Sequence, residues 1–305
     1  MNKENSDYVF TVFTPTYNRA DLLKRTYESI KNQTFTNFEW LIVDDGSTDN
    51  TKEVVNSWIK ENKIEIRYYY QTNSGKHVAI NRGVKVANGE LLFILDSDDW
   101  LPINSLENIY KNWKLITNQE KLVLSGVCGL CADKDGKIIG TKFPKDMTVS
   151  DQIEIRTFYD VKGDKCEVYI TDVLKQFPFP ENLGKFVTEA LVWNRIAQKY
   201  KMVYINDIWE YKEYLPSSLT NKSIKLRVNN LEATILYYKE FCEIKNKKIK
   251  IKHKLKGVIN YCRFSFHKKK IIQNFYHISG TLNKFLFIFL MPFSFLMYLR
   301  DKLKV

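Results

Sequence analysis

The hydrophobic positions of the first hundred residues follow two alternating patterns. Between the apolar runs, Leu23, Tyr27 and Ile30 recur at the spacing of an amphipathic helix. The short apolar runs themselves predict buried β-strands, and they occupy Tyr8–Thr14, Glu39–Val43, Glu65–Gln71 and Leu91–Leu95.

The next segment between strands, Thr51–Lys60, places Val54, Val55, Trp58 and Ile59 on one helical face. A third helix is expected between the last two strands. Because parallel strands must be joined by crossover connections, strands that alternate with helices predict an α/β fold with a doubly wound, mostly parallel sheet.

The pattern changes in the second half of the chain. Residues 186–200 have helical spacing, and residues 202–211 read as a further strand. From residue 222 to about 277 the chain looks helical and increasingly basic. We therefore predict one domain over residues 1–220, ending near Thr220 and divided into halves at residues 1–100 and 101–220, and a helical, basic region over residues 221–305.

The net charge of +12 belongs to the C-terminal end of the chain. Residues 241–305 hold 15 of the 47 lysines and arginines but only 2 of the 35 acidic residues, so the remainder is close to neutral. A basic tail of this kind needs an anionic partner or an anionic surface. With 44% hydrophobic residues, the chain can bury a core, which excludes global disorder.

A second feature of this end points to lipid. Phe285–Leu299 is uncharged, but as a helix it would be about 22 Å long, short of the roughly 30 Å hydrocarbon core, and Pro292 would kink it. We expect an interfacial anchor on the cytoplasmic face of the membrane, peripheral or monotopic, with Lys268–Lys270 on anionic headgroups. The alternative is a helix packed on the protein's own core.

The N-terminus and the cysteines indicate a reducing compartment. The sequence MNKENSDYVF has no apolar h-region, so we expect no secretory signal. Five cysteines are an odd number for a disulfide framework. Cys128 and Cys131 form a single CxxC without a second pair or a nearby histidine, and we interpret them as apolar strand residues.

The candidate chemistry lies where the predicted strands end. The run Leu91–Leu95 leads directly into Asp96, Asp98 and Asp99, and open α/β sheets bind ligands at the carboxyl ends of their strands. Carboxylates this close repel one another unless a cation or a shared proton joins them. The candidates are therefore a divalent metal or a carboxylate pair that shares one proton.

The other strand ends exclude two common nucleotide sites. TPTYNRA follows the first strand and has no glycine, so the dinucleotide-binding GxGxxG is missing, and no GxxxxGK[ST] is present. Asp44 or Asp45 suits hydrogen bonds to a base or ribose. Asp98 suits a hard cation such as Mg²⁺ or Mn²⁺ that bridges a diphosphate.

These segments resemble the family-2 glycosyltransferases, which have the GT-A fold. The resemblance covers residues 8–215 and rests on four motifs in order: FTPTYNRAD, LIVDDGSTDNT, NSGKHVAINRG and LLFILDSDDW. KGDKCEVYITDVLKQFPFP and KFVTEALVWNRIAQKYKMVYIND further resemble members that make capsular and surface polysaccharides.

The resemblance implies roles for individual residues. Asp96-Ser97-Asp98 would be the DxD motif, in which Asp96 faces the nucleotide sugar and Asp98 holds the metal, and Glu189 would be the catalytic base. Other donor-binding positions are Thr14, Pro15, Thr16, Tyr17, Arg19, Asp45 with Asp44 close behind, Lys76 and Asn81. We interpret His77 as a helix-start residue.

The implied function is a metal-dependent, inverting transfer from a nucleotide sugar, with UDP favoured by the resemblance, to a saccharide acceptor. Such a transfer needs one carboxylate for the metal and another as base. The basic, apolar end of the chain hints that the acceptor is lipid-linked. Trp193 and Arg195 can orient Glu189 or an acceptor phosphate, and Asp164 and Lys165 can contact the acceptor, although core packing or a solvated turn explains them as well.

Two alternatives remain open. A nucleotidyltransferase shares the sheet and the metal-binding Asp, but it usually grips a triphosphate with a glycine-rich, basic loop, where this chain offers only Arg19. A nucleic-acid-binding protein would use the basic tail, yet the uncharged Phe285–Leu299 is unsuited to a phosphate backbone. We therefore expect no nucleic-acid partner.

Overall fold

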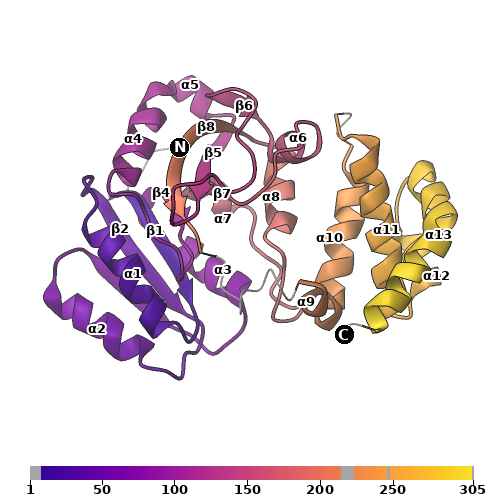
Figure 1. The fold of residues 1–305 in the computed structure, drawn as a ribbon, viewed down its shortest axis with the longest axis horizontal. Coiled ribbons are helices and arrows are strands. Elements are labelled where there is room, and N and C mark those ends of the chain that lie inside the picture. The colour runs from indigo at the N-terminus through magenta and orange to yellow at the C-terminus, as the bar shows by residue number, and fades with distance from the viewer. Residues whose placement is uncertain (1–7, 214–222, 246–247, 304–305) are drawn as a thin grey trace.

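The computed structural model describes residues 8–213, 223–245 and 248–303 (Figure 1). The boundary expected near Thr220 lies outside the described residues, as do residues 1–7, which open the segment expected to carry no secretory signal.

A single mixed sheet organises the first two thirds of the described chain, in the order β3-β2-β1-β4-β7-β5-β8-β6. The strands are β1 (Tyr8–Thr16), β2 (Phe38–Asp44), β3 (Ile66–Tyr70), β4 (Gly89–Ile94), β5 (Leu124–Ala132), β6 (Thr148–Ser150), β7 (Lys165–Ile170) and β8 (Lys201–Tyr211). β1 to β4 run parallel to one another, which confirms the prediction for the first hundred residues, whereas β7 runs antiparallel to both β4 and β5.

The strand register brings the polar strand ends to one edge. Thr16 of β1 pairs with Asp44 of β2, and Phe13 of β1 pairs with Ile94 of β4. β2 and β4 therefore end at the same edge of the sheet, and Asp44 and Asp96 lie at this edge.

One face of the sheet is covered by α1 (Ala20–Lys31), α2 (Thr51–Glu61) and α4 (Ser105–Leu115). Tyr27 stacks on Trp58 with ring centroids 4.4 Å apart, and both rings join the core as their spacing predicts. Ile59 was expected on the same face but is 38% exposed, because only the stripe that contains Val55 and Trp58 turns inward.

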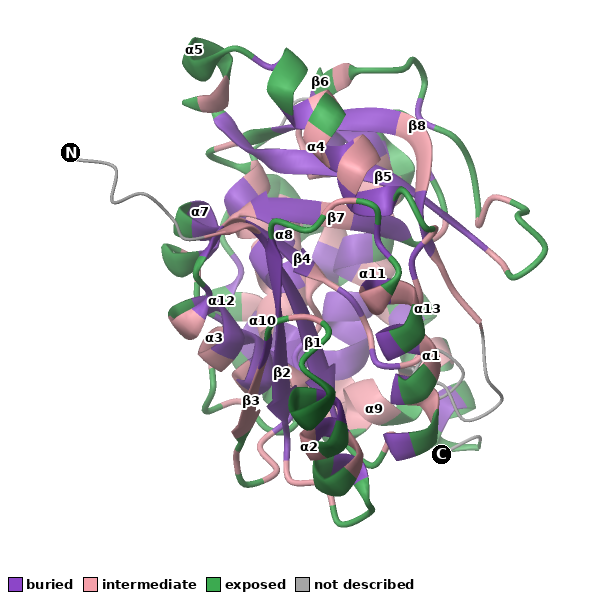
Figure 2. Cartoon of the chain, turned by 90° about the vertical axis from the view of Figure 1, so that its left-hand side faces the viewer, coloured by how far each residue is buried: buried purple, intermediate pink, exposed green. Residues whose placement is uncertain are grey.

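The opposite face carries α3 (Lys76–Val86), α6 (Gln152–Thr157), α7 (Thr171–Lys175) and α8 (Ala190–Ala197), and the short α5 (Asn118–Lys121) leads into β5. Burial on both faces explains the continuous apolar strands, which are almost entirely buried (Figure 2). Cys128 and Cys131 are buried in β5, as expected, and burial raises the pKa of both thiols.

The remaining helices form a separate layer beside α8 (Figure 1). They are α9 (Ser223–Asn229), α10 (Leu231–Glu243), α11 (Ile251–His267), α12 (Ile271–His277) and α13 (Thr281–Lys302). This layer has its own core around Tyr261, Phe264 and Phe287. It is tied to α8 by Arg195, which donates two hydrogen bonds to Glu240 of α10, at 2.8 and 2.6 Å.

The helix α13 is longer than the sequence suggested. It has 22 residues, about 33 Å, so the expected length was wrong; within the described residues it is the one helix long and apolar enough to cross a membrane. Charged residues extend it because Asp301 is buried against α11, where it accepts hydrogen bonds from Arg263 (2.5 Å to Nε) and contacts His267. Pro292 lies inside the helix without ending it.

Candidate active site

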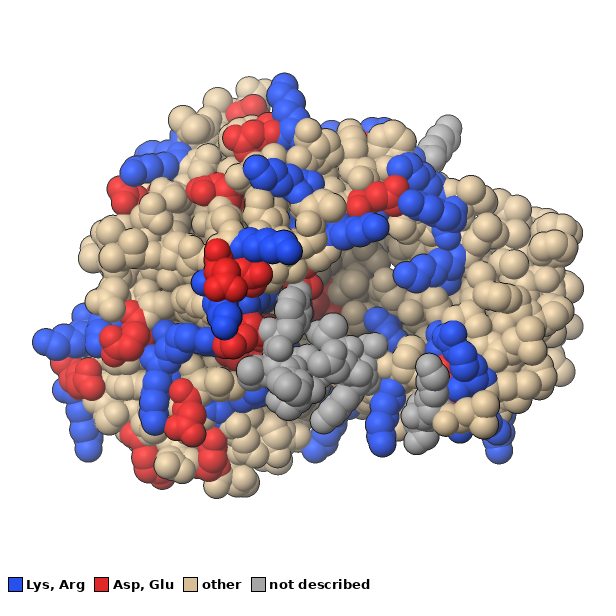
Figure 3. All heavy atoms as spheres, viewed as in Figure 1, with Lys and Arg blue, Asp and Glu red and all other residues tan. Residues whose placement is uncertain are grey.

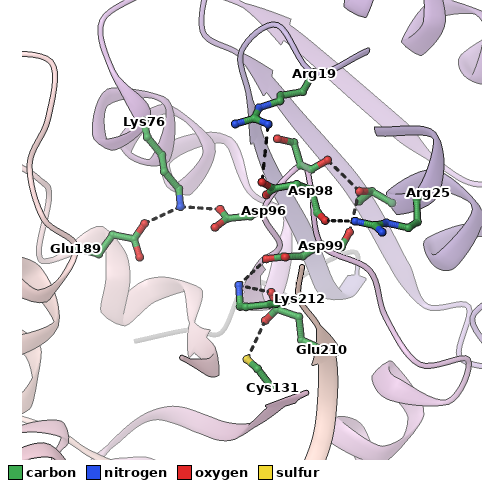
Figure 4. A network of polar contacts seen from close by, with 12 residues as sticks. Arg19, Arg25, Lys76, Asp96, Asp98, Asp99, Cys131, Glu189, Glu210 and Lys212 are labelled. Atoms are coloured by element: carbon green, nitrogen blue, oxygen red, sulfur yellow. Dashed lines mark hydrogen bonds and ion pairs between the residues drawn. The ribbon is translucent and has the colours of Figure 1, made fainter. Parts of the chain in front are cut away.

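Lys76 stands between two carboxylates at the carboxyl edge of the sheet (Figure 4). Its Nζ lies 2.6 Å from Oδ1 of Asp96 and 2.8 Å from Oε1 of Glu189. Lys76 begins α3, Asp96 follows β4 and Glu189 precedes α8. Three segments far apart in sequence therefore meet at one ammonium group.

The charges of this group stabilise one another. Burial opposes the charge of Lys76, but Asp96 and Glu189 outweigh it and raise the pKa of the ammonium above its usual range. Burial also opposes ionisation of Asp96, yet Lys76 and the more distant Lys212 and Arg19 lower its pKa to about 2. Asp96 is thus a carboxylate at any physiological pH.

The turn before Lys76 is held by Asp45. Its Oδ1 accepts hydrogen bonds from Gln71 Nε2 (2.8 Å) and Ser74 N (2.9 Å), and its Oδ2 accepts one from Gly75 N (2.8 Å). Gly75 has φ +103°, a backbone conformation that residues with a side chain rarely adopt. Asp45 therefore sets the direction in which α3 starts and in which Lys76 points.

Asp44 is fully buried, and it too has internal partners. It accepts hydrogen bonds from the Tyr68 hydroxyl (2.6 Å) and from Ser47 N (2.7 Å). Both strand-end carboxylates thus shape turns at the edge of the sheet, and a direct hydrogen bond from either to a base or ribose stays a prediction.

Asp98 and Asp99 follow Asp96 but have different surroundings. Asp98 is partly exposed and lies 3.9 Å from Nη1 of Arg19. Asp99 is buried, 2.5 Å from Lys212 Nζ, which also lies 2.7 Å from Glu210. Burial raises the pKa of Asp99 to about 9. Lys212 opposes this rise, whereas repulsion by Glu210 and Asp96 adds to it.

The three aspartates fit a hard cation. One carboxylate oxygen from each of Asp96, Asp98 and Asp99 lies within 4.8 Å of the others, a grouping of the oxygen ligands that Mg²⁺ and Mn²⁺ prefer. Because the side chain of Asp99 is buried whereas those of Asp96 and Asp98 are partly exposed, Asp96 and Asp98 are the two that can turn toward an ion.

The other donor-binding positions expected after β1 lie at or just beyond its end. Thr14, Pro15 and Thr16 are buried in the strand, and Thr14 Oγ1 accepts a hydrogen bond from the indole of Trp40. Tyr17 is 48% exposed, and Arg19 precedes α1. Ser97 is nearly buried, and its carbonyl accepts a hydrogen bond from Thr26 at 3.2 Å. A role of these residues in donor binding stays a prediction.

Asn81, predicted near the base and phosphates, has hydrogen-bond partners within the fold, and its contact with a donor stays a prediction. Its side chain donates to the carbonyl of Phe179 (2.9 Å) and to Glu181 (2.8 Å), and it accepts from Phe179 N (2.8 Å). These contacts attach α3 to residues 179–181 beside a second cavity of about 570 Å³. Asn81 is therefore engaged within the fold, outside the lining of the cavity that contains Lys76.

A pocket of about 810 Å³ extends from Lys76, Asp96 and Glu189 toward the helical layer. Its lining includes three charged residues that sequence reasoning missed, Glu167, Glu210 and Lys212. The signal was available, because each is a charge at or next to a strand that otherwise reads as buried (KCEVYI and DIWEYK).

Four residues with proposed acceptor contacts also lie near this pocket. Asp164, Lys165 and Trp193 line it, but Trp193 is also packed, with its ring 4.6 Å from that of Tyr169. Lys165 is buried, and its Nζ donates to three backbone carbonyls. Arg195 is occupied by Glu240. The packing alternative therefore accounts for Trp193 and Arg195, and acceptor contact stays a prediction.

His77 is the second residue of α3, as interpreted from the sequence, but it also lines the pocket. It is 2% exposed, neither ring nitrogen has a hydrogen-bond partner among the described residues, and burial lowers its pKa. The imidazole is therefore neutral near pH 7.

Comparisons with known proteins agree on one class. The sequence model of the family described as Glycosyl transferase family 2 matches residues 11–124. Glycosyltransferase GlyG of Streptococcus pneumoniae is 38% identical over 210 residues, 65% of this chain and 68% of the relative.

Two further similarities cover most of the chain. A Campylobacter jejuni protein named GalNAc(5)-diNAcBac-PP-undecaprenol beta-1,3-glucosyltransferase is 27% identical over 286 residues, 91% of this chain and 88% of that one. The crystal structure of S. aureus TarS 1-349 with UDP-GlcNAc superimposes with a TM-score of 0.59 at 20% identity, over 87% of this chain and 88% of that chain. This likeness supports the GT-A fold.

Glu167 predicts a pH dependence of stability. Burial raises its pKa to about 7 in the folded protein, from about 4.5. Between these values the folded chain keeps a proton that the unfolded chain has lost, so stability decreases as pH rises through this range. The variant Glu167→Gln cannot ionise. We compare its unfolding free energy with that of wild type, and this difference should be more favourable to the variant at pH 8 than at pH 4 by roughly 1–3 kcal/mol.

Urea denaturation followed by tryptophan fluorescence measures this difference. The exposed Glu65→Gln is the control and should show no comparable difference between the two pH values. An equal effect of Glu167→Gln at both pH values would contradict the proposed burial of the charge.

Proposed function

The chain belongs to glycosyl transferase family 2, and from this premise we propose that it transfers a sugar from a UDP-sugar to a lipid-linked saccharide acceptor, with inversion and with Mg²⁺ or Mn²⁺. The observation that carries the proposal is the meeting of Asp96, Lys76 and Glu189 in one pocket. Because the chain belongs to this family, we favour sugar transfer over the two alternatives, a nucleotidyltransferase and a nucleic-acid-binding protein.

Glu189 is the proposed base. It lines the pocket at the start of α8, on the side of Lys76 opposite the DxD aspartates (Figure 4). A base there can take the proton of an acceptor hydroxyl as the oxygen attacks the anomeric carbon from the face opposite the leaving nucleotide. Lys76 holds the carboxylate in place before the substrates bind.

Asp98, together with Asp96, would hold the metal. When bound, a divalent ion supplies positive charge that stabilises the departing diphosphate. Arg19, beside Asp98, and Lys76, beside Asp96, provide additional cations next to these two carboxylates. We propose Thr16, Tyr17 and Arg19 as nucleoside contacts because the end of β1 leaves them nearest the strand-end edge.

The donor and acceptor classes draw on the relatives. The TarS structure holds UDP-GlcNAc, and the Campylobacter relative is named for an acceptor joined to undecaprenol through PP. A saccharide on a prenyl diphosphate is therefore the acceptor class that we propose, in surface polysaccharide synthesis. We assign the donor-binding half to residues 1–100, the acceptor half to residues 101–220 and membrane association to residues 221–305.

We propose that α13 attaches the protein to the cytoplasmic face of the membrane. Its inner side packs on α11, and Asp301 is paired with Arg263, so α13 cannot cross the bilayer without leaving this contact. Its outer side exposes Phe285, Phe289 and Leu296, among others. In the view of Figure 3 this end of the molecule is largely without charged side chains, as expected for a surface that dips into one leaflet.

The first test concerns the base. Glu189→Gln keeps the size of the side chain but cannot accept a proton, so kcat should decrease roughly 10²–10⁴-fold. UDP binding, measured by calorimetry, should remain close to that of wild type, and the exposed Glu65→Gln should keep full activity. A Glu189→Gln enzyme with near wild-type kcat would refute the assignment.

The second test concerns the metal. Asp98→Asn should weaken Mn²⁺-dependent UDP binding about ten-fold or more, because a charged ligand is lost. Asp21→Asn, on the exposed surface of α1, is the control. Equal UDP binding with and without EDTA, in both wild type and Asp98→Asn, would show that Asp98 does not act through a metal.

The third test concerns the membrane. The exposed pair Phe289→Glu and Phe293→Glu should reduce flotation with phosphatidylglycerol vesicles at least about ten-fold, because two aromatic anchors are replaced by charges that anionic lipid repels. Ile251→Glu changes an equally exposed residue on α11 and should float like wild type. If all three proteins float equally, α13 is not the anchor.

A further inference from the structure

The pocket has a second, basic wall that the donor chemistry does not use. Besides the sheet edge, it is lined by Arg227 of α9, by Tyr237, Tyr238 and Phe241 of α10, and by Lys256 of α11. The helical layer therefore closes the pocket on the side away from the DxD aspartates, where Figure 3 shows a hollow between the two parts of the molecule.

Most cations around the pocket already have partners. Lys76 lies between Asp96 and Glu189, and Lys212 lies between Asp99 and Glu210. The same holds for Arg195 with Glu240, for His253 with Asp160, and for Arg156, which lies 3.9 Å from Glu167. The charges of these residues are therefore balanced within the fold.

Arg227 and Lys256 form no ion pair with a described carboxylate. Two other lysines of the lining, Lys165 and Lys185, also lack one, but Lys165 donates to three backbone carbonyls and Lys185 donates to Asn73 Oδ1 at 2.9 Å. Arg227 Nη1 is buried and has no hydrogen-bond partner among the described residues. Residues 214–222, which precede α9, contain no Asp or Glu that could neutralise it. A buried donor without an acceptor is costly unless a ligand satisfies it.

Aromatic rings position this guanidinium. Its Cζ lies 5.6 Å from the ring centroid of Tyr237 and 5.5 Å from that of Tyr238. Cation–π contacts hold the plane of an arginine without consuming its N–H donors. Nη1 therefore remains available to donate to an anion, and phosphate oxygens are acceptors that suit an arginine.

We propose that Arg227 and Lys256 form a subsite for the diphosphate of a prenyl-diphosphate-linked acceptor. This inference rests on the proposed function, since it takes the acceptor to be lipid-linked. The aromatic residues of α10 would contact the adjoining sugar or prenyl carbons. The acceptor would then lie across the pocket, with its phosphate end at the helical layer that carries α13 and its reactive hydroxyl toward Glu189.

The test measures binding rather than turnover. The full-length protein is saturated with UDP and Mg²⁺, so that the donor site is occupied, and is titrated with farnesyl diphosphate by calorimetry. Arg227→Gln should weaken binding about ten-fold and Lys256→Gln about three-fold, the exposed lysine contributing less. Arg227→Lys keeps the charge and should recover part of the loss.

Three controls make the result specific. Lys254→Gln removes the same charge from α11 outside the pocket lining and should bind within about two-fold of wild type. Farnesol, which lacks phosphate, should bind weakly to every variant. Dihexanoylphosphatidylglycerol carries a lipid headgroup phosphate, and its binding should be the same in wild type and in Arg227→Gln.

The inference is overturned if Arg227→Gln binds farnesyl diphosphate like wild type, or if Lys254→Gln loses as much as Lys256→Gln. It is also overturned if phosphatidylglycerol shows the same dependence on Arg227, which would make this a membrane headgroup site. Failure of the proposed function would look different: the wild-type protein would not transfer sugar, but its binding of farnesyl diphosphate could still be measured and compared with that of the variants.

Discussion

Carboxylates crowd the carboxyl edge of the sheet, and they can do so because a lysine lies between each opposing pair. Lys76 joins Asp96 to Glu189, and Lys212 joins Asp99 to Glu210. Lys76 keeps Asp96 ionised, and Lys212 opposes the rise in the pKa of Asp99 that burial, Glu210 and Asp96 cause. The two lysines thereby fix α3, α8 and the end of β8 against the segment that follows β4, and the shape of the pocket follows from this arrangement.

The first hundred residues could be predicted well because their signal is local. Continuous apolar strands and helical spacing reflect burial by neighbouring elements, and the parallel order followed from the alternation. The meeting of Asp96 with Glu189 is different. No periodicity connects residues 93 positions apart in sequence, and only the family resemblance pointed to both.

Charges inside the sheet and in the helical layer were harder to predict. Glu167 and Glu210 belong to strands that are otherwise buried, and alternation alone cannot tell a pocket from solvent. In the same way, the basic region was evident from composition, but the partners of its lysines were not: Lys268 pairs with Glu232 and Lys250 with Asp160. The extra length of α13 depended on the burial of Asp301 by Arg263, a contact between distant residues.

The two walls of the pocket come from stretches of chain that meet mainly through α8 and α10. Such a division allows independent change. Exchange of α9–α11 between related enzymes could alter which glycolipid is recognised while leaving nucleotide chemistry untouched. A chimaera would need to preserve the pairs that join the two parts, among them Arg195 with Glu240, Lys250 with Asp160 and Lys248 with Glu154. Diversity of bacterial glycans could then arise by recombination at a joint between helices.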